Sequence, residues 1–407
     1  MRKLPLLLVL ALFFVSCSKD DTPSGNENPK EQQDPDPVVE EEPQIGLQFF
    51  GNEKEYDMGV SLHTTSEGFI GFEKINETID RLENDLAIRK LSPELELIEE
   101  IVVEIEGGFD VSQVVSLPDG TFLLVGRRFV MGGSFPVIQN MNDKGEVLKS
   151  YLFGGYMEIL DLNGRATSVT VTDAALYVTI DFFGNQTTIA AIDYNFEEIW
   201  HRTFNSSLNS KGYWSGDSLY FTNTTKEGDS NLHDTLNIFK LGAENGQTLW
   251  EQKFENIKAD FSANHYINKM MHVGDELLLF GCIGREESAS TGQVPQGLFM
   301  KLKQEDGEQV ERLLFDDYWA VVDAIVVDND IIIGGYSVRS ELAISRVNSD
   351  DTMDWDYFYG PRSNENLTSF QMVNGQIVFI GSVQATPEND DRDAVYGILD
   401  AETGQLQ

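Results

Sequence analysis

The side chains that most often carry out chemistry are sparse in this chain of 407 residues. It contains two cysteines, Cys17 and Cys282, and five histidines: His63, His201, His233, His265 and His272. None of them follows the His-x-x-x-His or Cys-x-x-Cys spacing that is typical of zinc sites. The sequence also has no Gly-x-Ser-x-Gly elbow and no phosphate-binding loop. These patterns predict neither a catalytic residue nor a metal site, and Cys282, in an apolar stretch, is expected to be a small buried side chain.

Carboxylates, by contrast, are abundant. The chain has 68 acidic and 29 basic residues, which gives a formal net charge of -39. A surface of this sign repels phosphate backbones, so nucleic acid is excluded as an expected partner. The densest acidic stretches, residues 348–351 and 389–393, lack the alternating spacing and the distal Glu of an EF-hand loop. We therefore expect no cofactor, with bound Ca²⁺ as the alternative.

A unit of four β-strand patterns recurs along the chain and would position these side chains. In residues 106–153, strand patterns at 111–117, 121–125, 135–140 and 147–153 are separated by turn signals such as Asp119-Gly120. The aromatic or apolar residue that ends each unit recurs in six steps averaging about 51 residues, at Phe50, Ile105, Phe153, Phe204, Phe254, Phe315 and Tyr359. A period of this size with four strands per unit is typical of a β-propeller.

The repeats predict an all-β fold, a seven-bladed β-propeller of four-stranded antiparallel blades. The blades are expected at residues 51–105, 106–153, 154–204, 205–254, 255–315, 316–359 and 360–407. The last repeat ends after its third strand, so an N-terminal strand at 45–50 is expected to complete the last blade and close the ring, which covers an exposed edge. The first repeat carries an insertion at 73–85, where Ile75, Ile79, Leu82 and Leu86 have helical spacing. This insertion is expected to form a short helix or an irregular loop.

The N-terminus has the pattern of an export signal. Arg2 and Lys3 precede an apolar run at residues 4–15, and the small residue Ser16 precedes Cys17. This pattern resembles the lipobox of bacterial lipoproteins, which implies that residues 1–16 are a signal peptide and that Cys17 is lipidated. Residues 18–21, Ser-Lys-Asp-Asp, resemble the acidic signal that directs Bacteroidetes lipoproteins to the outside of the outer membrane.

Residues 17–44 are expected to be a disordered acidic tether, because they are rich in Pro and acidic residues and have no apolar period. The globular part would then begin at residue 45. The expected location is the outer membrane, facing the cell exterior, with contact to the membrane only through the lipid anchor. A lipoprotein that faces the periplasm is the alternative.

Two phrases in the repeats resemble those of a known family. Residues 242–250 and 399–404, the latter Leu-Asp-Ala-Glu-Thr-Gly, are similar to the docking repeat of quinoprotein-alcohol-dehydrogenase-like (PQQ-like) β-propellers, in which such a turn precedes a Trp-bearing outer strand. The resemblance implies a propeller. Enzymes of that family hold pyrroloquinoline quinone beside Ca²⁺, often over a disulfide of adjacent cysteines, and this sequence has no adjacent cysteines. Many relatives are non-catalytic lipoproteins, including a scaffold that assists outer-membrane protein assembly.

Three functions follow as hypotheses. The first is a non-catalytic, surface-tethered lipoprotein that binds a protein or glycan ligand, acting as a monomer or as part of an outer-membrane complex. The second is a quinoprotein-like or other propeller enzyme, which would contain a bound cofactor. The third is a periplasmic scaffold for outer-membrane assembly. The first is favoured because every recognisable feature of the sequence is structural or directs the chain to a location.

The ligand is expected at the mouth of the central channel, which the innermost strand of each blade lines. Counting about nine residues back from each first turn gives Asp57, Asp110, Arg165, His265, Trp319 and Asn366. Side chains of these types can form hydrogen bonds with a sugar or peptide and stack on it. Alternatively, they cap turns or pack between blades. The loops at 222–234 and 284–297 are expected to set specificity.

Overall fold

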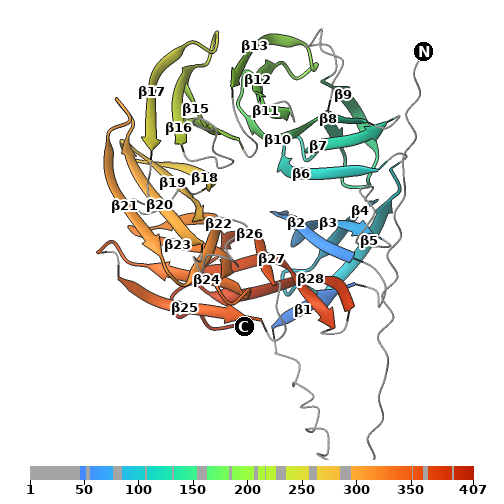
Figure 1. Cartoon of the computed structure of the whole chain (residues 1–407). Helices are drawn as coiled ribbons and strands as arrows, with labels where there is room; N and C mark the ends of the chain where they lie inside the picture. Colours follow the sequence, from blue (N-terminus) through green and yellow to red (C-terminus); the bar gives the residue numbers. More distant parts are fainter. Residues whose placement is uncertain are drawn as a thin grey trace, which may run out of the picture. The chain divides into compact units, whose positions relative to one another are not determined.

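The described part of the chain is built from β-strands that pair almost entirely in antiparallel register. The structure is a computed structural model and describes residues 46–51, 56–76, 85–105, 108–130, 133–153, 163–182, 186–205, 210–215, 217–225, 235–255, 264–284, 295–350, 352–360, 365–386 and 389–407. The described residues belong to one compact unit, residues 44–407. The strands of this unit form seven four-stranded blades arranged as a β-propeller (Figure 1), so the predicted fold class is confirmed.

Each blade runs from its innermost to its outermost strand. Blade 1 contains β2 (Tyr56–Thr64), β3 (Phe69–Asn76), β4 (Asp85–Leu91) and β5 (Leu97–Val103). Blade 2 contains β6 (Phe109–Ser116), β7 (Phe122–Val130), β8 (Gly133–Met141) and β9 (Val147–Leu152). Blade 3 contains β10 (Gly164–Val171), β11 (Leu176–Phe182), β12 (Gln186–Ile192) and β13 (Glu198–Asn205). Blade 4 contains β14 (Lys211–Ser215), β15 (Ser218–Thr225), β16 (Thr235–Gly242) and β17 (Thr248–Glu255).

The remaining blades follow the same plan. Blade 5 contains β18 (Asn264–Val273), β19 (Glu276–Gly284), β20 (Gln296–Lys303) and β21 (Gln309–Phe315). Blade 6 contains β22 (Tyr318–Val327), β23 (Asp330–Ser337), β24 (Leu342–Val347) and β25 (Met353–Tyr359). Blade 7 contains β26 (Asn366–Val373), β27 (Gln376–Thr386) and β28 (Asn389–Asp400), and its fourth strand is the N-terminal β1 (Leu47–Phe50).

The burial of each strand reflects its place in the blade. All seven residues of β11 are buried, as are most of those in β12, because neighbouring blades cover both faces of these strands. The outermost strands instead alternate between exposed and half-buried residues, as in β13 and β17. The second and third strands of a blade therefore read as nearly continuous apolar runs, whereas the fourth has the period of a strand with one solvated face.

Apolar contacts join each blade to the next. Leu123 and Ile138 of blade 2 pack with Val178 and Ile180 of blade 3 in one core cluster. Similar clusters fill the other interfaces between consecutive blades, including the one between blade 7 and blade 1, where Ile380 of β27 and Leu62 of β2 belong to the same cluster. The ring of blades is thus held together mainly by burial of apolar surface at its interfaces.

A Trp on the outer strand of one blade contacts a Gly in the outer turn of the next blade. The indole nitrogen of Trp200 in blade 3 donates a hydrogen bond to the carbonyl oxygen of Ala243 in blade 4, at 2.8 Å. Its ring lies so close to Gly246 that a Cβ atom there would come within 2.6 Å of it. Trp250 and Gly307 repeat this contact between blades 4 and 5.

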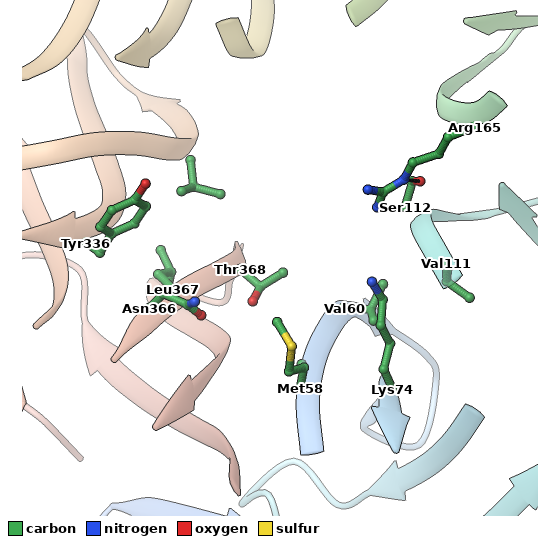
Figure 2. A pocket seen from close by; sticks show the side chains of 12 residues that line it. Met58, Val60, Lys74, Val111, Ser112, Arg165, Tyr336, Asn366, Leu367 and Thr368 are labelled. Carbon is green, nitrogen blue, oxygen red and sulfur yellow. Dashed lines mark hydrogen bonds between the residues drawn. The ribbon is translucent and has the colours of Figure 1, made fainter. Parts of the chain in front are cut away.

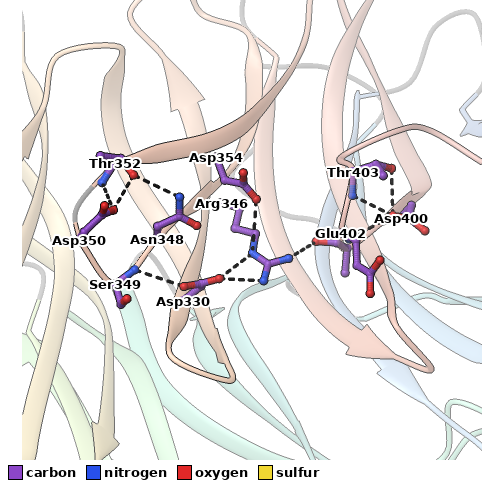
Figure 3. Close-up of polar contacts among 11 residues, drawn as sticks. Asp330, Arg346, Asn348, Ser349, Asp350, Thr352, Asp354, Asp400, Glu402 and Thr403 are labelled. Carbon is purple, nitrogen blue, oxygen red and sulfur yellow. Dashed lines mark hydrogen bonds and ion pairs between the residues drawn. The ribbon is translucent and has the colours of Figure 1, made fainter.

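The interface between blades 6 and 7 uses the same outer turn with an added arginine (Figure 3). Gly404 lies against the ring of Trp355, and Asp400 accepts a hydrogen bond from the backbone N–H of Thr403 at 2.8 Å. Arg346 bonds to Asp330 in its own blade and donates a hydrogen bond to the carbonyl oxygen of Ala401 in blade 7, at 3.1 Å. The residues that gave the family resemblance therefore join blades to one another.

The N-terminal strand closes the ring. β1 pairs with β28 in antiparallel register from Leu47 opposite Gly397 to Phe50 opposite Ala394. The ring of Phe50 meets that of Tyr396 edge to face at 5.4 Å, and the Arg89 guanidinium lies over Phe50 at 4.9 Å. Strand β28 also touches blade 1 directly through a single parallel bridge to β2. The last blade is therefore completed by residues from both ends of the described chain.

A buried ion pair lies beside this closure. The Arg89 Nε atom donates to both carboxylate oxygens of Glu73 at 2.9 Å, and the Tyr396 hydroxyl also donates to Glu73. Glu73 belongs to β3, so the prediction of a helix or loop beginning at residue 73 was wrong there, because residues 73–75 continue the strand pairing to β4. Residues 77–84 lie outside the described part of the chain.

Candidate functional site

Irregularities in the innermost strands direct side chains toward the propeller axis. Register shifts interrupt the pairing of β2, β6, β10, β18, β22 and β26 with their neighbours. A bulge inserts one extra residue and re-aims side chains at that point. Val60, Ser112 and Thr368 are such extra residues, and all three line a central cavity.

This cavity has a volume of about 250 Å³. Its lining comes from blades 1, 2, 3, 6 and 7 and consists of Met58, Gly59, Val60, Lys74, Val111, Ser112, Arg165, Val322, Tyr336, Asn366, Leu367 and Thr368. Figure 2 shows Lys74 and Arg165 directed into it on one side, with Tyr336, Leu367 and Asn366 on the opposite side. The cavity therefore has a cationic side and a side that is mostly apolar.

The cationic side is organised around Asp110. Its carboxylate contacts the Lys74 ammonium at 2.6 Å, the Arg127 Nε at 3.0 Å and an Arg165 Nη at 3.8 Å. Arg165 also donates a hydrogen bond from Nε to the Ser112 hydroxyl at 2.5 Å. Three cations thus face one carboxylate in this cluster, and two of them, Lys74 and Arg165, line the cavity.

The pKa values reflect this crowding of positive charge. Burial would raise the pKa of Asp110, but the charges of Lys74 and Arg165 outweigh it and hold that pKa below its ordinary value. Burial lowers the pKa of Lys74, and the charges of Arg165 and Arg127 lower it further, although the ion pair with Asp110 opposes them. On blade 4, burial and the charge of Arg165 lower the pKa of Lys211 to about 8. The charge of Arg165 therefore also acts on Lys211 in the next blade, where Asp181 opposes it.

The six residues predicted to bind a ligand divide into three pairs. Arg165 and Asn366 line the cavity. Asp110 and Trp319 lie behind lining residues: Asp110 holds Lys74 and Arg165, and the Trp319 ring contacts that of Tyr336 at 6.1 Å. Asp57 and His265 are each 1% exposed, and the lining is formed by other residues.

Sequence reasoning missed most of the lining. Lys74 was assigned to the insertion, although a Lys within the apolar run of residues 69–75 is a signal that could have identified it. Ser112 and Thr368 reach the cavity because they lie at bulges. The presence of a small polar residue in a sequence does not predict a bulge. Tyr336 comes from a second strand rather than an innermost one. Most of the two long loops, residues 226–234 and 285–294, lies outside the described residues.

The described residues do not fit a Ca²⁺ and quinone centre. Among them, no group of three or more His, Cys, Asp and Glu side chains could hold a metal ion. Among these residues, cations outnumber carboxylates around the cavity. Ca²⁺ instead binds to several oxygen ligands, most of them carboxylates and carbonyls. At residues 348–352, Asp350 accepts hydrogen bonds from Thr352 and thereby caps its own turn (Figure 3). The side chains of residues 389–391 are outside the description. Cys282 is buried in β19, as predicted.

No helix among the described residues is long and apolar enough to cross a membrane. Cys17 and the residues around it lie outside the described part of the chain, so the predicted signal peptide, lipid anchor and tether stay predictions.

Solved structures of other proteins are similar to this chain at low sequence identity. A scan of protein-family models and a search of curated proteins found no match. Similar solved structures include the β-propeller domain of the Trilobed protease from Pyrococcus furiosus, which has an open velcro topology, at 14% identity and a TM-score of 0.48 over 86% of this chain and 97% of that one.

Two others are similar over comparable lengths of this chain. Acylaminoacyl peptidase from Pyrococcus horikoshii has 13% identity and a TM-score of 0.49 over 86% of this chain and 52% of that one. A chain of the complex of Drosophila Plexin A with Semaphorin 1b has 10% identity and a TM-score of 0.45 over 87% and 86%. At such identities the likeness concerns the fold alone.

Proposed function

We propose that this protein is a non-catalytic binding module, a β-propeller that is tethered to the outer membrane by a lipid on Cys17 and takes its ligand in the central cavity. The observation that carries the proposal is the cavity itself. Side chains from five blades converge on a space of about 250 Å³, and they combine two cations, three hydroxyl groups and an amide with apolar side chains. A few polar groups placed around an otherwise apolar hollow are typical of small-molecule sites.

The framework suits binding because it is rigid. Blade interfaces are filled by apolar side chains, and β1 closes the ring beside the Glu73–Arg89 pair. Side chains held on strands of such a frame need little ordering when a ligand arrives, which preserves affinity. The proposed position outside the cell rests on the sequence pattern at Ser16-Cys17 and the acidic residues that follow it.

The proposal is tested by filling the cavity without changing its charge. Thr368→Trp places a large side chain at a lining position, and Ile199→Trp, at a residue 53% exposed on the outer strand β13, is the matched control. Ligands and partners are cross-linked on intact cells that carry the full-length protein and identified by mass spectrometry. We expect Thr368→Trp to lose the bound species and Ile199→Trp to keep them. Equal capture by both variants would place the binding site elsewhere.

A further inference from the structure

We infer that the cavity binds a small organic acid, with its carboxylate or phosphate group between Lys74 and Arg165 and its uncharged body against Tyr336 and Leu367. This inference deepens the proposed function and rests on it. It assigns the class of ligand from the charge, the unused hydrogen-bond donors and the shape of the described lining.

Charge is the first argument. Among the described residues, three cations lie within 4 Å of the Asp110 carboxylate, so this cluster holds a surplus of two positive charges. The whole chain has a net charge of -39, so a local surplus of cations runs against its composition. A structural ion pair needs only one cation for one carboxylate. The surplus is instead what a site for an anion requires, because a bound oxyanion neutralises it.

Unused donors are the second argument. An ammonium group has three N–H donors and a guanidinium has five. Toward the described residues, Lys74 uses one donor for Asp110, and Arg165 bonds through Nε to Ser112 while one Nη lies 3.8 Å from Asp110. Both side chains line the cavity and are directed into it, so their remaining donors are available to a ligand there (Figure 2). A planar guanidinium beside an ammonium can bind two oxygens of one carboxylate or phosphate.

The opposite wall fits an uncharged body. Tyr336 is supported from behind by the ring of Trp319, and Leu367 adds an apolar surface next to it. The Asn366 side-chain oxygen is buried and meets no hydrogen-bond partner among the described residues. It can accept a hydrogen bond from a hydroxyl group of the ligand. A volume of about 250 Å³ suits a molecule of the size of one sugar acid rather than a polymer segment.

The test uses three probes that separate charge from shape: glucuronate, glucose and inorganic phosphate. Binding to the full-length protein in detergent solution is measured by calorimetry. Arg165→Gln removes one cation that is already partly exposed, and Thr368→Glu adds a carboxylate to the opposite wall, so the two variants reduce the surplus charge from different sides. Lys253→Gln removes a cation of the outer strand β17 as the matched control.

We expect glucuronate, phosphate or both to bind the wild-type protein and the control. An acid that binds the wild type should bind Arg165→Gln and Thr368→Glu at least about tenfold more weakly. Which acid binds more tightly distinguishes a carboxylate from a phosphate ligand. Glucose should bind more weakly than glucuronate, and added salt should weaken the binding of the acids. The inference is overturned if neither acid binds, if glucose binds as well as glucuronate, or if both charge variants bind like the wild type.

The outcome also separates this inference from the proposed function. If no acid binds although Thr368→Trp abolishes capture on cells, the cavity is the binding site and its ligand is not an organic acid. If Thr368→Trp leaves capture unchanged, the proposed function itself fails.

Discussion

Burial in this propeller shifts the pKa values of individual side chains from those of the free amino acids, and His63 is an example. His63, at the end of β2, shares hydrogen bonds with Ser61 at 3.0 Å and Ser116 at 2.7 Å and meets the rings of Phe72 and Phe122. Burial lowers the pKa of His63 from 6.5 to about 4. The folded protein therefore holds this imidazole neutral under mildly acidic conditions, in which the unfolded chain would bind a proton.

The sign of the resulting pH dependence follows from that difference. Because the folded pKa is depressed, the contribution of His63 to stability is complete above pH 6.5 and is lost as the pH falls toward about 4. The loss is on the order of 3 kcal/mol. Burial raises the pKa of Glu73, so Glu73 changes the pH dependence of stability in the opposite direction. Its contribution is the same in the wild type and in a His63 variant, so it cancels when the two proteins are compared.

The prediction is that His63→Gln flattens the fall of the free energy of unfolding between pH 6.5 and pH 4. Urea titrations of the wild type and the variant across this range measure the difference between the two curves, in which shared groups cancel. Parallel curves would show that His63 is not held neutral in the folded state.

At the scale of the elements, bulges bring Val60, Ser112 and Thr368 to the cavity, and they account for part of the errors of the sequence-based prediction. Arg165 and Asn366 stand two residues before the bulge residues Thr167 and Thr368. His265, like Asp57, stands three residues before the corresponding bulge residue. Because side chains alternate along a strand, an offset of one residue moves a side chain to the other face.

The sequence nevertheless predicted the elements themselves. Strong turn signals such as Asp119-Gly120 and the regular apolar strands identify four-stranded units without any tertiary information. A bulge has no comparable signal, since residues as different as Val60 and Ser112 occupy it. The position of a strand was therefore predictable and the direction of its side chains was not.

The Trp–Gly contacts between blades give a prediction for two glycines with similar backbones. Gly246 has a φ of +66° and lies against Trp200, whereas Gly120 has a φ of +82° and nothing lies within 4 Å of a Cβ built there. Gly120→Ala should cost about 1 kcal/mol through backbone strain alone. Gly246→Ala should cost roughly 1 to 3 kcal/mol more, because the methyl group displaces the indole. Denaturant unfolding measures both, and equal losses would mean that the Trp200 contact does not hold the blades together.

Ring closure predicts a large effect of removing β1. Deleting residues 46–50 leaves the outer edge of β28 without its partner strand and removes the buried Leu47 and the ring contact of Phe50. The free energy of unfolding should fall by several kcal/mol, and the exposed edge should promote association. Deleting residues 38–42, in the predicted tether, is the matched control. A β1 deletion that stays monomeric with the melting temperature of the wild type would contradict this role.

For the whole molecule, acidic composition and a cationic centre are the two features that bear on function. The net charge of -39 is that of a strongly acidic chain, and a surface of this sign is expected to repel nucleic acid, while Lys74, Arg127 and Arg165 cluster around Asp110. Composition alone predicted the first feature. The second depends on residues from three blades meeting in space, so no single stretch of sequence shows it.

The proposed lipid anchor concerns the whole chain, and it is tested at Cys17. We expect Cys17→Ala to release the protein from membranes or to block removal of the leader, because the cysteine is the proposed site of lipidation. Cell fractionation and the mass of the mature N-terminus measure both outcomes. Digestion of intact cells with added protease should remove the anchored wild type if it faces the exterior. Unchanged membrane association and leader cleavage in the variant would contradict the anchor.

The most direct measurement is native mass spectrometry of the full-length protein purified from its own cells. The wild type and Ile199→Trp are predicted to carry a small acidic molecule, and Thr368→Trp and Arg165→Gln are predicted to lack it. The same bound molecule in all four proteins, or none in any of them, would contradict a central cavity that binds an organic acid.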